Sequence, residues 1–248
     1  MDLQTAIKWK KKSKLFVSLA ARPGKTGEKF YSALFEYHKI DAEYMACECK
    51  DFVQDIRLVR EHCDGASITM PFKQLVNQHI DRSESPNSAI NTVVNYSSLL
   101  VGYNCDYLGL KEVLGNKLKD QTVVVLGDGA MAENVIMLSD QAHNIIQISR
   151  RKNNWDQRHT NCDVLINTTS IGMGTDQSPV DFINAHTVID CVIGKTSLIQ
   201  QAQEKNKQVV TGADIYQAQF KHQFKLYTHQ EPDSATVSSV AKRVFSYV

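Results

Sequence analysis

A glycine-rich turn in the middle of the chain constrains the fold most. The run Thr122–Leu126 is apolar and β-branched and predicts a buried strand. Gly127-Asp128-Gly129-Ala130-Met131-Ala132 follows directly and opens a helical pattern through Asn134–Leu138. The GxGxxG/A dinucleotide-binding pattern requires this strand–turn–helix order, because its glycines allow the tight turn and the close approach of a pyrophosphate. The alternative is a purely structural turn, since glycine turns after strands are common.

The residues after the next expected strand favour NADP over NAD. Ile145–Ile148 leads into Ser149-Arg150-Arg151-Lys152, about twenty residues past the glycine turn, where an NAD site places an acid for the ribose 2′-hydroxyl. A hydroxyl and three cations stand there instead. They suit a 2′-phosphate, because guanidinium groups pair with phosphate oxygens. The alternative is a solvated basic loop.

The rest of the chain repeats the alternation of strands and helices. Apolar, β-branched runs are separated by amphipathic stretches such as Glu28–His38, which predicts an α/β fold with mostly parallel sheets. Ser83–Asn95 is expected to be rich in loops, and Tyr216–Tyr227 and Ser234–Tyr247 are expected to be helices. The expected strands are Leu15–Ala20, Ala66–Met70, Thr122–Leu126, Ile145–Ile148, Val164–Asn167, Thr187–Val192 and Gln208–Val210.

A domain break is expected near Cys105–Lys119, where a helix-like stretch leads to a fresh strand at Gln121. We expect the C-terminal helices to pack on the first half of the chain. The predicted domains are a substrate-binding and catalytic domain of residues 1–105 and 217–248, and a Rossmann-like domain of residues 106–216.

Composition argues against several classes of protein. Lys and Arg number 28 and Asp and Glu 27, so a nucleic-acid partner is not expected. No apolar run approaches the roughly 20 residues of a membrane span. The basic run before Leu15 superficially resembles a signal peptide, but Arg22-Pro23 stands where a cleavage site belongs. We expect a solvated basic tail, a cytoplasmic protein, reduced cysteines and no metal site, since the 6 cysteines form no CxxC pair.

Candidate chemistry lies in the first half of the chain. In Ser67–Lys73 the proline ends a strand and places Thr69 and Lys73 at the rim of a sheet. If Lys73 and Asp106 converge, the ammonium can polarise and protonate a ketone oxygen while the carboxylate orients it. Each patch also has a structural explanation, because most lysines are solvated and most loop Asn and Asp residues cap turns.

Several short segments, spread over most of the chain, can be compared with known families as an ordered set. They are Ser67–Lys73, Ala89–Val93, Asn104–Asp106, Val124–Ala132, Ile166–Met173, Asp190–Val192 and Tyr216–Tyr227. In this order they resemble the shikimate dehydrogenase family. Two further segments, Ser18–Pro23 and Leu226–Gln230, are more similar to its divergent shikimate dehydrogenase-like branch.

The resemblance implies an NADP-dependent oxidoreductase of aromatic amino acid biosynthesis that interconverts 3-dehydroshikimate and shikimate by hydride transfer. It implies a small-molecule substrate, a monomer or homodimer, and an α/β substrate domain completed by C-terminal helices beside a Rossmann-like domain. The implied catalytic pair is Lys73 and Asp106. The implied substrate-binding residues are Thr26, Ser67, Thr69, Asn91 and Gln217, and the implied cofactor-binding residues are Gly127, Gly129, Ala130, Met131, Ala132, Ser149, Arg150, Arg151, Asn167, Thr168, Met173 and Gly212.

The chain departs from the family at the substrate carboxylate. The family pattern there is Ser-x-Ser followed by Pro, and this chain has Gly24-Lys25-Thr26-Gly27. Loss of one charge-assisted hydrogen bond costs about 1.5–3 kcal/mol, and Lys25 is a candidate replacement. Weak shikimate activity, a quinate or other hydroxy-acid dehydrogenase, and a non-catalytic NADP or ligand sensor are therefore the alternatives. Retention of Lys73 and Asp106 argues against the sensor.

Overall fold

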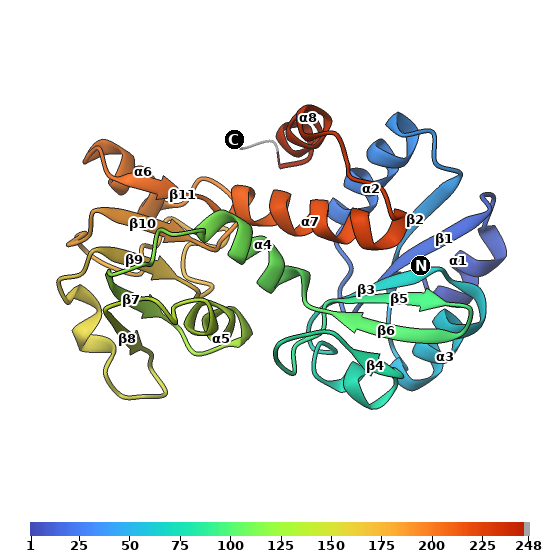
Figure 1. Cartoon of the computed structure of the whole chain (residues 1–248), viewed down its shortest axis with the longest axis horizontal. Helices are drawn as coiled ribbons and strands as arrows, with labels where there is room; N and C mark the ends of the chain where they lie inside the picture. Colours follow the sequence, from blue (N-terminus) through green and yellow to red (C-terminus); the bar gives the residue numbers. More distant parts are fainter. Residues whose placement is uncertain (246–248) are drawn as a thin grey trace. The chain divides into compact units, whose positions relative to one another are not determined.

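The structure, a computed structural model, describes residues 1–245, which form two compact units, each built on its own sheet (Figure 1). Unit 1 comprises Met1–Cys105 and Phe220–Val244, and unit 2 comprises Asp106–Gln219. Each unit combines a sheet with helices on both faces, so the predicted α/β class is confirmed. Among the described residues, no helix is both long and apolar enough to cross a membrane.

The sheet of unit 1 has 6 strands in the order β2-β1-β3-β5-β6-β4. Three of them, β1 (Lys14–Ala20), β2 (Ala42–Glu48) and β3 (Gly65–Ile68), are parallel. The strands β5 (Thr92–Tyr96) and β6 (Leu99–Tyr103) form an antiparallel hairpin, and the short β4 (Arg82–Ser83) pairs with β6. This sheet is therefore mixed.

The expectation that Ser83–Asn95 is rich in loops is confirmed for residues 84–91, but it missed the hairpin, because β5 begins at Thr92. Its turn is made by Ser97 and Ser98, which have φ of 53° and 74°. Such turns usually carry Asn-Gly or Asp-Gly, so a Ser-Ser turn gives no sequence signal. Asn95 stabilises it, because the Ser98 N–H donates to Asn95 Oδ1 at 2.7 Å.

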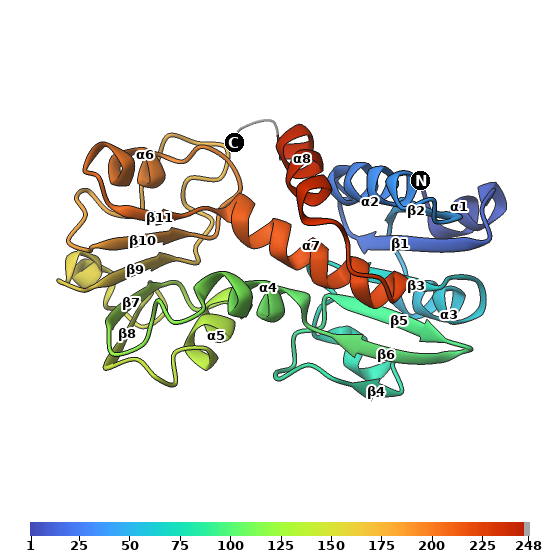
Figure 2. The same cartoon turned by 45° about the horizontal axis from the view of Figure 1, so that its top comes forward.

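Helices cover both faces of the unit 1 sheet (Figure 2). Leu15, Val17 and Leu19 of β1 belong to the core formed with α1 (Leu3–Trp9) and α3 (Phe52–His62). The alternate residue Phe16 packs against Phe35 and Tyr227, from α2 (Thr26–Tyr37) and α7 (Gly212–Thr228). The last described helix is α8 (Ser234–Phe245); Tyr247, the end of the expected helix, lies outside the described residues.

The predicted basic tail, Lys8–Lys12, is largely exposed as expected, but the residues before it are not solvated, because they fold as α1. Asp2 caps this helix by accepting a hydrogen bond from the Thr5 N–H at 2.8 Å. Leu3 and Ala6 are fully buried in the core of unit 1, and the exposed lysines begin at Lys8. Two buried residues in one short helix are too few to give a readable period.

Unit 2 contains the predicted parallel sheet, with 5 strands in the order β11-β10-β9-β7-β8. Apolar residues fill both faces, with α4 (Cys105–Leu114) and α5 (Ala130–Met137) on one and α6 (Ser197–Glu204) on the other. The chain reverses direction across the sheet between β7 and β9, and ligands bind outside the carboxyl ends of strands at such a point. The strands are β7 (Thr122–Leu126), β8 (Asn144–Ile148), β9 (Val164–Asn167), β10 (Thr187–Asp190) and β11 (Gln208–Val210).

Candidate functional site

The glycine turn of unit 2 is held between the ends of three strands. Gly127 has a φ of 120°, its N–H donates to the Ile148 carbonyl at 2.8 Å, and its carbonyl accepts from Gln147 Nε2 at 3.0 Å. Thr168 Oγ1 donates to the Leu126 carbonyl at 2.6 Å. A Cβ on Gly127 would lie 2.4 Å from that Thr168 Oγ1. Both the backbone conformation and the contact therefore require glycine.

Gly127→Ala is expected to lower the free energy of unfolding by about 1–3 kcal/mol from backbone strain alone. Gly129→Ala is the matched control for stability, because Gly129 has a φ of −91° and a Cβ there meets nothing within 4 Å. Thermal unfolding of both variants checks this prediction. Equal loss of melting temperature in the two variants would contradict it.

The first turn of α5 is open to an anion. Gly129 is its N-cap residue and provides no side-chain cap. The backbone N–H groups of a first turn lack partners within the helix, and the helix dipole adds partial positive charge there. Ala130 and Met131 are half-buried, and Ala132 packs in the core of unit 2. This arrangement suits a pyrophosphate.

A second loop, Ser149–Asn154, follows the carboxyl end of β8 and is stabilised by hydrogen bonds. The buried Ser149 donates its N–H to Asn154 Oδ1 at 3.0 Å and accepts the Lys152 N–H at 3.2 Å. Asn154 Nδ2 in turn donates to the Gln147 carbonyl at 3.1 Å. The loop therefore has a defined conformation.

This loop presents two exposed guanidinium groups. Arg150 lies over the ring of Trp155, 5.5 Å from its centroid. Arg151 lies 3.9 Å from the carboxylate of Asp128 in the glycine turn, and 84% of its side chain is exposed. Two exposed cations and a serine beside a first-turn anion site are the donor set that a 2′-phosphate needs.

The loop after β9 is stabilised by hydrogen bonds that lead to the buried carboxylate of Asp190. Asn167 is fully buried; its Nδ2 donates to Asp190 Oδ1 at 2.9 Å and its Oδ1 accepts from Thr169 Oγ1 at 2.7 Å. Asp190 also accepts from Thr196 Oγ1 at 2.6 Å, and burial raises the pKa of Asp190. The Asn167 side chain therefore shapes the loop from within, and Met173 is exposed at its far end.

Gly212 allows the start of α7 to pack closely within unit 2. A Cβ on Gly212 would lie 2.2 Å from the carbonyl oxygen of Val192, which follows β10. This residue therefore positions the first turn of α7 beside the carboxyl end of the sheet.

Unit 1 carries a row of hydroxyl groups across its sheet. Strand register places Ser18 of β1 beside Ser67 of β3, and Ser67 beside Thr92 of β5. Ser18 and Ser67 lie near the carboxyl ends of β1 and β3, and Thr92 begins β5.

Gln223 of α7 joins this row. Its Nε2 donates to Thr92 Oγ1 at 2.6 Å, and its Oε1 accepts from Ser67 Oγ at 3.1 Å and from the Tyr31 hydroxyl. Gln223 is 1% exposed. Sequence reasoning missed it, although a glutamine between the apolar positions Phe220, Phe224 and Tyr227 is a signal that could have revealed it.

Two further tyrosines surround Ser67. The Tyr44 hydroxyl donates to Ser67 Oγ, and the Tyr227 hydroxyl lies 3.1 Å from it. Burial raises the pKa of Tyr31, Tyr44 and Tyr227, so all three remain protonated donors at neutral pH. Ser67 therefore has its hydrogen-bonding capacity filled within unit 1.

Asn91 carries an unpaired buried donor. It is 3% exposed, and its Oδ1 accepts from Thr92 Oγ1 and from the Cys105 N–H, both at 2.8 Å. Its Nδ2 is buried without a hydrogen-bond partner. An unpaired buried donor costs about 1–3 kcal/mol, so this group is a candidate contact for a ligand. Asp106, 8% exposed, stands one residue after Cys105 in the first turn of α4.

The lysine segment is hydrogen-bonded to the residues that lead into β5, which include Asn91. The Lys73 carbonyl accepts the Ile90 N–H at 2.9 Å, and the Thr69 carbonyl accepts the Phe72 N–H at 2.8 Å. Both Thr69 and Lys73 are partly exposed. Unit 1 thus brings Thr69, Lys73 and Asn91 together, whereas Asp106 belongs to unit 2.

The other predicted substrate residues lie on helices. Thr26 is exposed at the start of α2, and a Cβ on Gly27 would lie 3.3 Å from the Tyr44 ring. Gln217 lies on α7 within unit 2. Helical periodicity places Gln219, and not Gln217, one turn before Gln223 on the same face.

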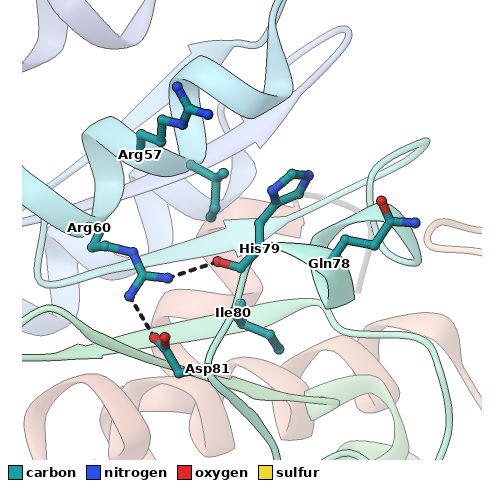
Figure 3. Close-up of a pocket in the computed structure, with 7 residues that line it drawn as sticks. Arg57, Arg60, Gln78, His79, Ile80 and Asp81 are labelled. Atoms are coloured by element: carbon teal, nitrogen blue, oxygen red, sulfur yellow. Dashed lines mark hydrogen bonds and ion pairs between the residues drawn. The ribbon is translucent and has the colours of Figure 1, made fainter.

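A hollow on the α3 side of unit 1 contains none of the predicted site residues (Figure 3). Arg60 donates there to Asp81 Oδ2 at 2.6 Å and to the carbonyls of His79, at 3.0 Å, and Ser98. Arg57 extends away from this ion pair (Figure 3). Arg60 therefore joins α3 to the segments around β4 and β6.

The ion pair predicts how stability depends on pH. The Arg60 guanidinium and the Leu100 N–H hold the pKa of Asp81 below its usual value. Asp81 therefore contributes stability above its unfolded pKa of about 3.9, and this contribution disappears as pH falls through the lower folded pKa. We expect Asp81→Asn to lower the melting temperature by about 2–4 °C at pH 7. The difference from the unsubstituted protein should shrink below about pH 4; a constant difference would contradict this assignment.

The cysteines are all free thiols. Burial raises the pKa of Cys162 to about 11 and of Cys47 to about 12, so neither is ionised at neutral pH. Within residues 1–245, no cluster of three or more His, Cys, Asp and Glu side chains could hold a metal ion.

Comparisons with known proteins agree with this architecture. A sequence model of the shikimate dehydrogenase substrate binding domain matches residues 28–95. A shikimate dehydrogenase-like protein of Haemophilus influenzae is 29% identical over 261 residues, covering 93% of this chain and 96% of that protein. The solved structure of a shikimate 5-dehydrogenase-like protein is 27% identical and superposes with a TM-score of 0.85, covering 95% of this chain and 98% of the other.

A third relative decides membership. The shikimate dehydrogenase (NADP(+)) of Clostridium beijerinckii is 30% identical over 221 residues, covering 75% of this chain and 81% of that enzyme. Together with the two-domain fold and the separate polar sites of its units, this similarity shows that the chain belongs to the shikimate dehydrogenase family, several members of which are named as NADP(+) enzymes.

Proposed function

We propose that this protein is an NADP-dependent oxidoreductase that interconverts 3-dehydroshikimate and shikimate. The observation that carries the proposal is the buried, unpaired Nδ2 of Asn91, which follows the residue whose N–H bonds to the Lys73 carbonyl. A substrate hydroxyl would satisfy this donor, and Lys73 would face the neighbouring oxygen. Family relatives named as NADP-dependent support the cofactor.

The residues of unit 2 fit NADP. The open first turn of α5 would hold the pyrophosphate through Gly127, Gly129 and the backbone of Ala130–Ala132. Ser149, Arg150 and Arg151 would hold the 2′-phosphate. Thr168 and Met173, on the loop shaped by Asn167, and Gly212 would border the remainder of the cofactor. When bound, NADP supplies the acceptor or donor of hydride.

The proton of the reaction would be supplied by a side chain of this protein. Reduction of a ketone adds a hydride and a proton, and in our proposal the proton comes from Lys73 Nζ to the carbonyl oxygen. In the reverse direction Lys73 takes it from the alcohol. Asp106 would orient the ammonium and accept from a substrate hydroxyl, while Thr69 and Asn91 bind other hydroxyls. Ser67 would support this set through its bonds to Gln223 and Tyr44.

The proposal assigns substrate binding to residues 1–105 and 217–248 and nucleotide binding to residues 106–216. Gln217 remains a proposed substrate residue, although Gln219, two residues further along α7, is the one that shares a helix face with Gln223. We further propose a cytoplasmic monomer or homodimer with no nucleic-acid partner, in keeping with the balance of 28 basic and 27 acidic residues.

The start of α2 supports an acidic substrate. Lys25 is its N-cap residue and makes no side-chain cap, so the backbone N–H groups of the first turn are open. These N–H groups, the exposed Thr26 hydroxyl and Lys25 would together bind a carboxylate. Because this set differs from the family's pair of serines, quinate or another hydroxy-acid is the second candidate substrate.

Lys25→Ala is expected to raise the KM for shikimate about tenfold, because it removes a cation from the carboxylate. Lys29→Ala is the control, since Lys29 is an exposed lysine of the same helix. Initial rates at several shikimate concentrations measure both constants. An unchanged KM in Lys25→Ala would show that Lys25 does not bind the carboxylate.

The first experiment is NADP⁺ reduction with shikimate and with quinate, followed through NADPH absorbance, with NAD⁺ as the control. Saturable NADP⁺-specific turnover of shikimate is the expected result. Turnover of quinate alone would transfer the proposal to the second substrate. NADPH binding without turnover of either compound would overturn the proposed activity.

A further inference from the structure

We propose that Thr92 and Gln223 are positioning residues that fix the orientation of the Asn91 carboxamide. They form a chain of hydrogen bonds from Tyr31 and Ser67 to Asn91. This series of hydrogen bonds leaves Asn91 Nδ2 available to a ligand and keeps Asn91 Oδ1 bonded to the Cys105 N–H at the start of α4. The inference rests on the proposed function only in taking the ligand of Nδ2 to be a substrate hydroxyl.

The donor and acceptor of every hydrogen bond in this series follow from one backbone group. The Cys105 N–H can only donate, so the Asn91 atom 2.8 Å from it must be the oxygen. The Thr92 hydroxyl, 2.8 Å from that same oxygen, must then use its single hydrogen to donate to it. With its hydrogen used, Thr92 Oγ1 must accept from Gln223, 2.6 Å away. The Gln223 atom there is therefore the NH2 group.

The same reasoning assigns the hydrogen bonds at Tyr31 and Ser67, the other end of the series. With its NH2 group directed to Thr92, Gln223 presents its oxygen to Tyr31 and Ser67, and both hydroxyls must donate to it. Ser67 then has no hydrogen left for Tyr44 or Tyr227, so both tyrosines donate to Ser67. All these groups are buried. Reversing any amide would place two acceptors or two donors in contact, which is costly in a buried site.

This series of hydrogen bonds matters for function because the Asn91 carboxamide has two roles. Its oxygen holds the backbone at the start of α4, one residue before Asp106, and its nitrogen lies free for a ligand. Without the Thr92 hydroxyl, only the Cys105 N–H would resist rotation of the carboxamide. A less ordered Asn91 binds its ligand more weakly, because orientation then has to be achieved during binding.

The test compares Thr92→Val, which removes the hydroxyl, with Thr92→Ser, which keeps it. We expect Thr92→Val to raise the KM for shikimate about tenfold and to leave the KM for NADP⁺ within about twofold. Thr92→Ser should restore the KM to within about twofold of the unsubstituted protein. Gln223→Met, which retains the length of the side chain, should resemble Thr92→Val. The control is Thr228→Val, because the Thr228 hydroxyl donates to the Phe224 carbonyl and accepts the Gln230 N–H, both outside this set of hydrogen bonds.

A second measurement is independent of activity. In protein labelled with ¹⁵N-asparagine, the Asn91 side-chain NH2 signals are assigned by their loss in Asn91→Ala. We expect these signals to shift in Thr92→Val and Gln223→Met and to remain in place in Thr92→Ser and Thr228→Val.

The outcomes separate this inference from the proposed function. If the unsubstituted protein reduces NADP⁺ with neither shikimate nor quinate, the proposed function fails and the NMR signals alone decide the positioning role. If it turns over shikimate but Thr92→Val has an unchanged KM and unchanged Asn91 signals, the positioning role is overturned and the function stands. Failure of Thr92→Ser to restore the KM would also overturn it, because a hydroxyl at residue 92 would then not be sufficient to keep the KM.

Discussion

Lys73→Met is expected to lower kcat for shikimate oxidation by about 10²–10⁴-fold, the usual contribution of a general acid or base. Methionine keeps an unbranched apolar side chain and removes the only group of residue 73 that carries a transferable proton. The Lys73 backbone, which accepts the Ile90 N–H, is untouched, so the segment that leads through Asn91 into β5 should keep its place. NADPH binding, which we assign to unit 2, should be unchanged. Steady-state rates and a direct NADPH titration measure the two effects.

The control for this variant is Lys50→Met, which removes a lysine of unit 1 whose side chain is 80% exposed. It should retain kcat. If Lys73→Met also retains kcat within about threefold, the proton comes from another group and the assignment of Lys73 is wrong.

The double variant Arg150→Ala, Arg151→Ala is expected to lower kcat/KM for NADP⁺ about a hundredfold or more and to leave that for NAD⁺ nearly unchanged. Each guanidinium should contribute about 1.5–3 kcal/mol to binding of the 2′-phosphate, and NAD lacks this group. The loop should survive the change, because the bonds that hold it come from Ser149 and Asn154. Rates with both cofactors measure the ratio.

Lys205→Ala is the control, because it removes an exposed cation of unit 2 at the C-cap of α6. It should preserve the preference for NADP⁺. Equal losses with NADP⁺ and NAD⁺ in the double variant would show that the arginines support the loop and do not read the 2′-phosphate.

Unit 2 could be predicted more completely than unit 1, for a physical reason. Parallel strands are buried on both faces and therefore appear as continuous apolar runs. Thr122–Leu126, Val164–Asn167 and Gln208–Val210 have the same bounds in the sequence prediction and in the structure. The β5–β6 hairpin of unit 1 was missed because its Ser97-Ser98 turn lacks the glycine or asparagine that usually marks such a turn. The strand β2 was missed as well.

The candidate site divides in the same way. The glycine turn, the Ser149–Lys152 cations and the Lys73 segment are short motifs, so their chemistry is visible in consecutive residues. Gln223 and Tyr31 are 192 residues apart in the chain and meet through a hydrogen bond inside unit 1. The apolar neighbours of Gln223 on α7 could have indicated its burial, but no local pattern encodes its partner.

The chain's residue types and spacing were therefore sufficient to predict the α/β class, the glycine turn between β7 and α5, and NADP as the cofactor, because these predictions depend on neighbours within short strand–turn–helix units. The availability of each polar group depended on folding. Ser67 was expected to bind substrate, yet strand register and the return of α7 surround it with Gln223, Tyr44 and Tyr227. Asn91 was expected on the same grounds, and its Nδ2 is left unpaired. Hydrogen-bond capacity is used up by whichever groups folding brings near, and that depends on contacts far apart in the chain.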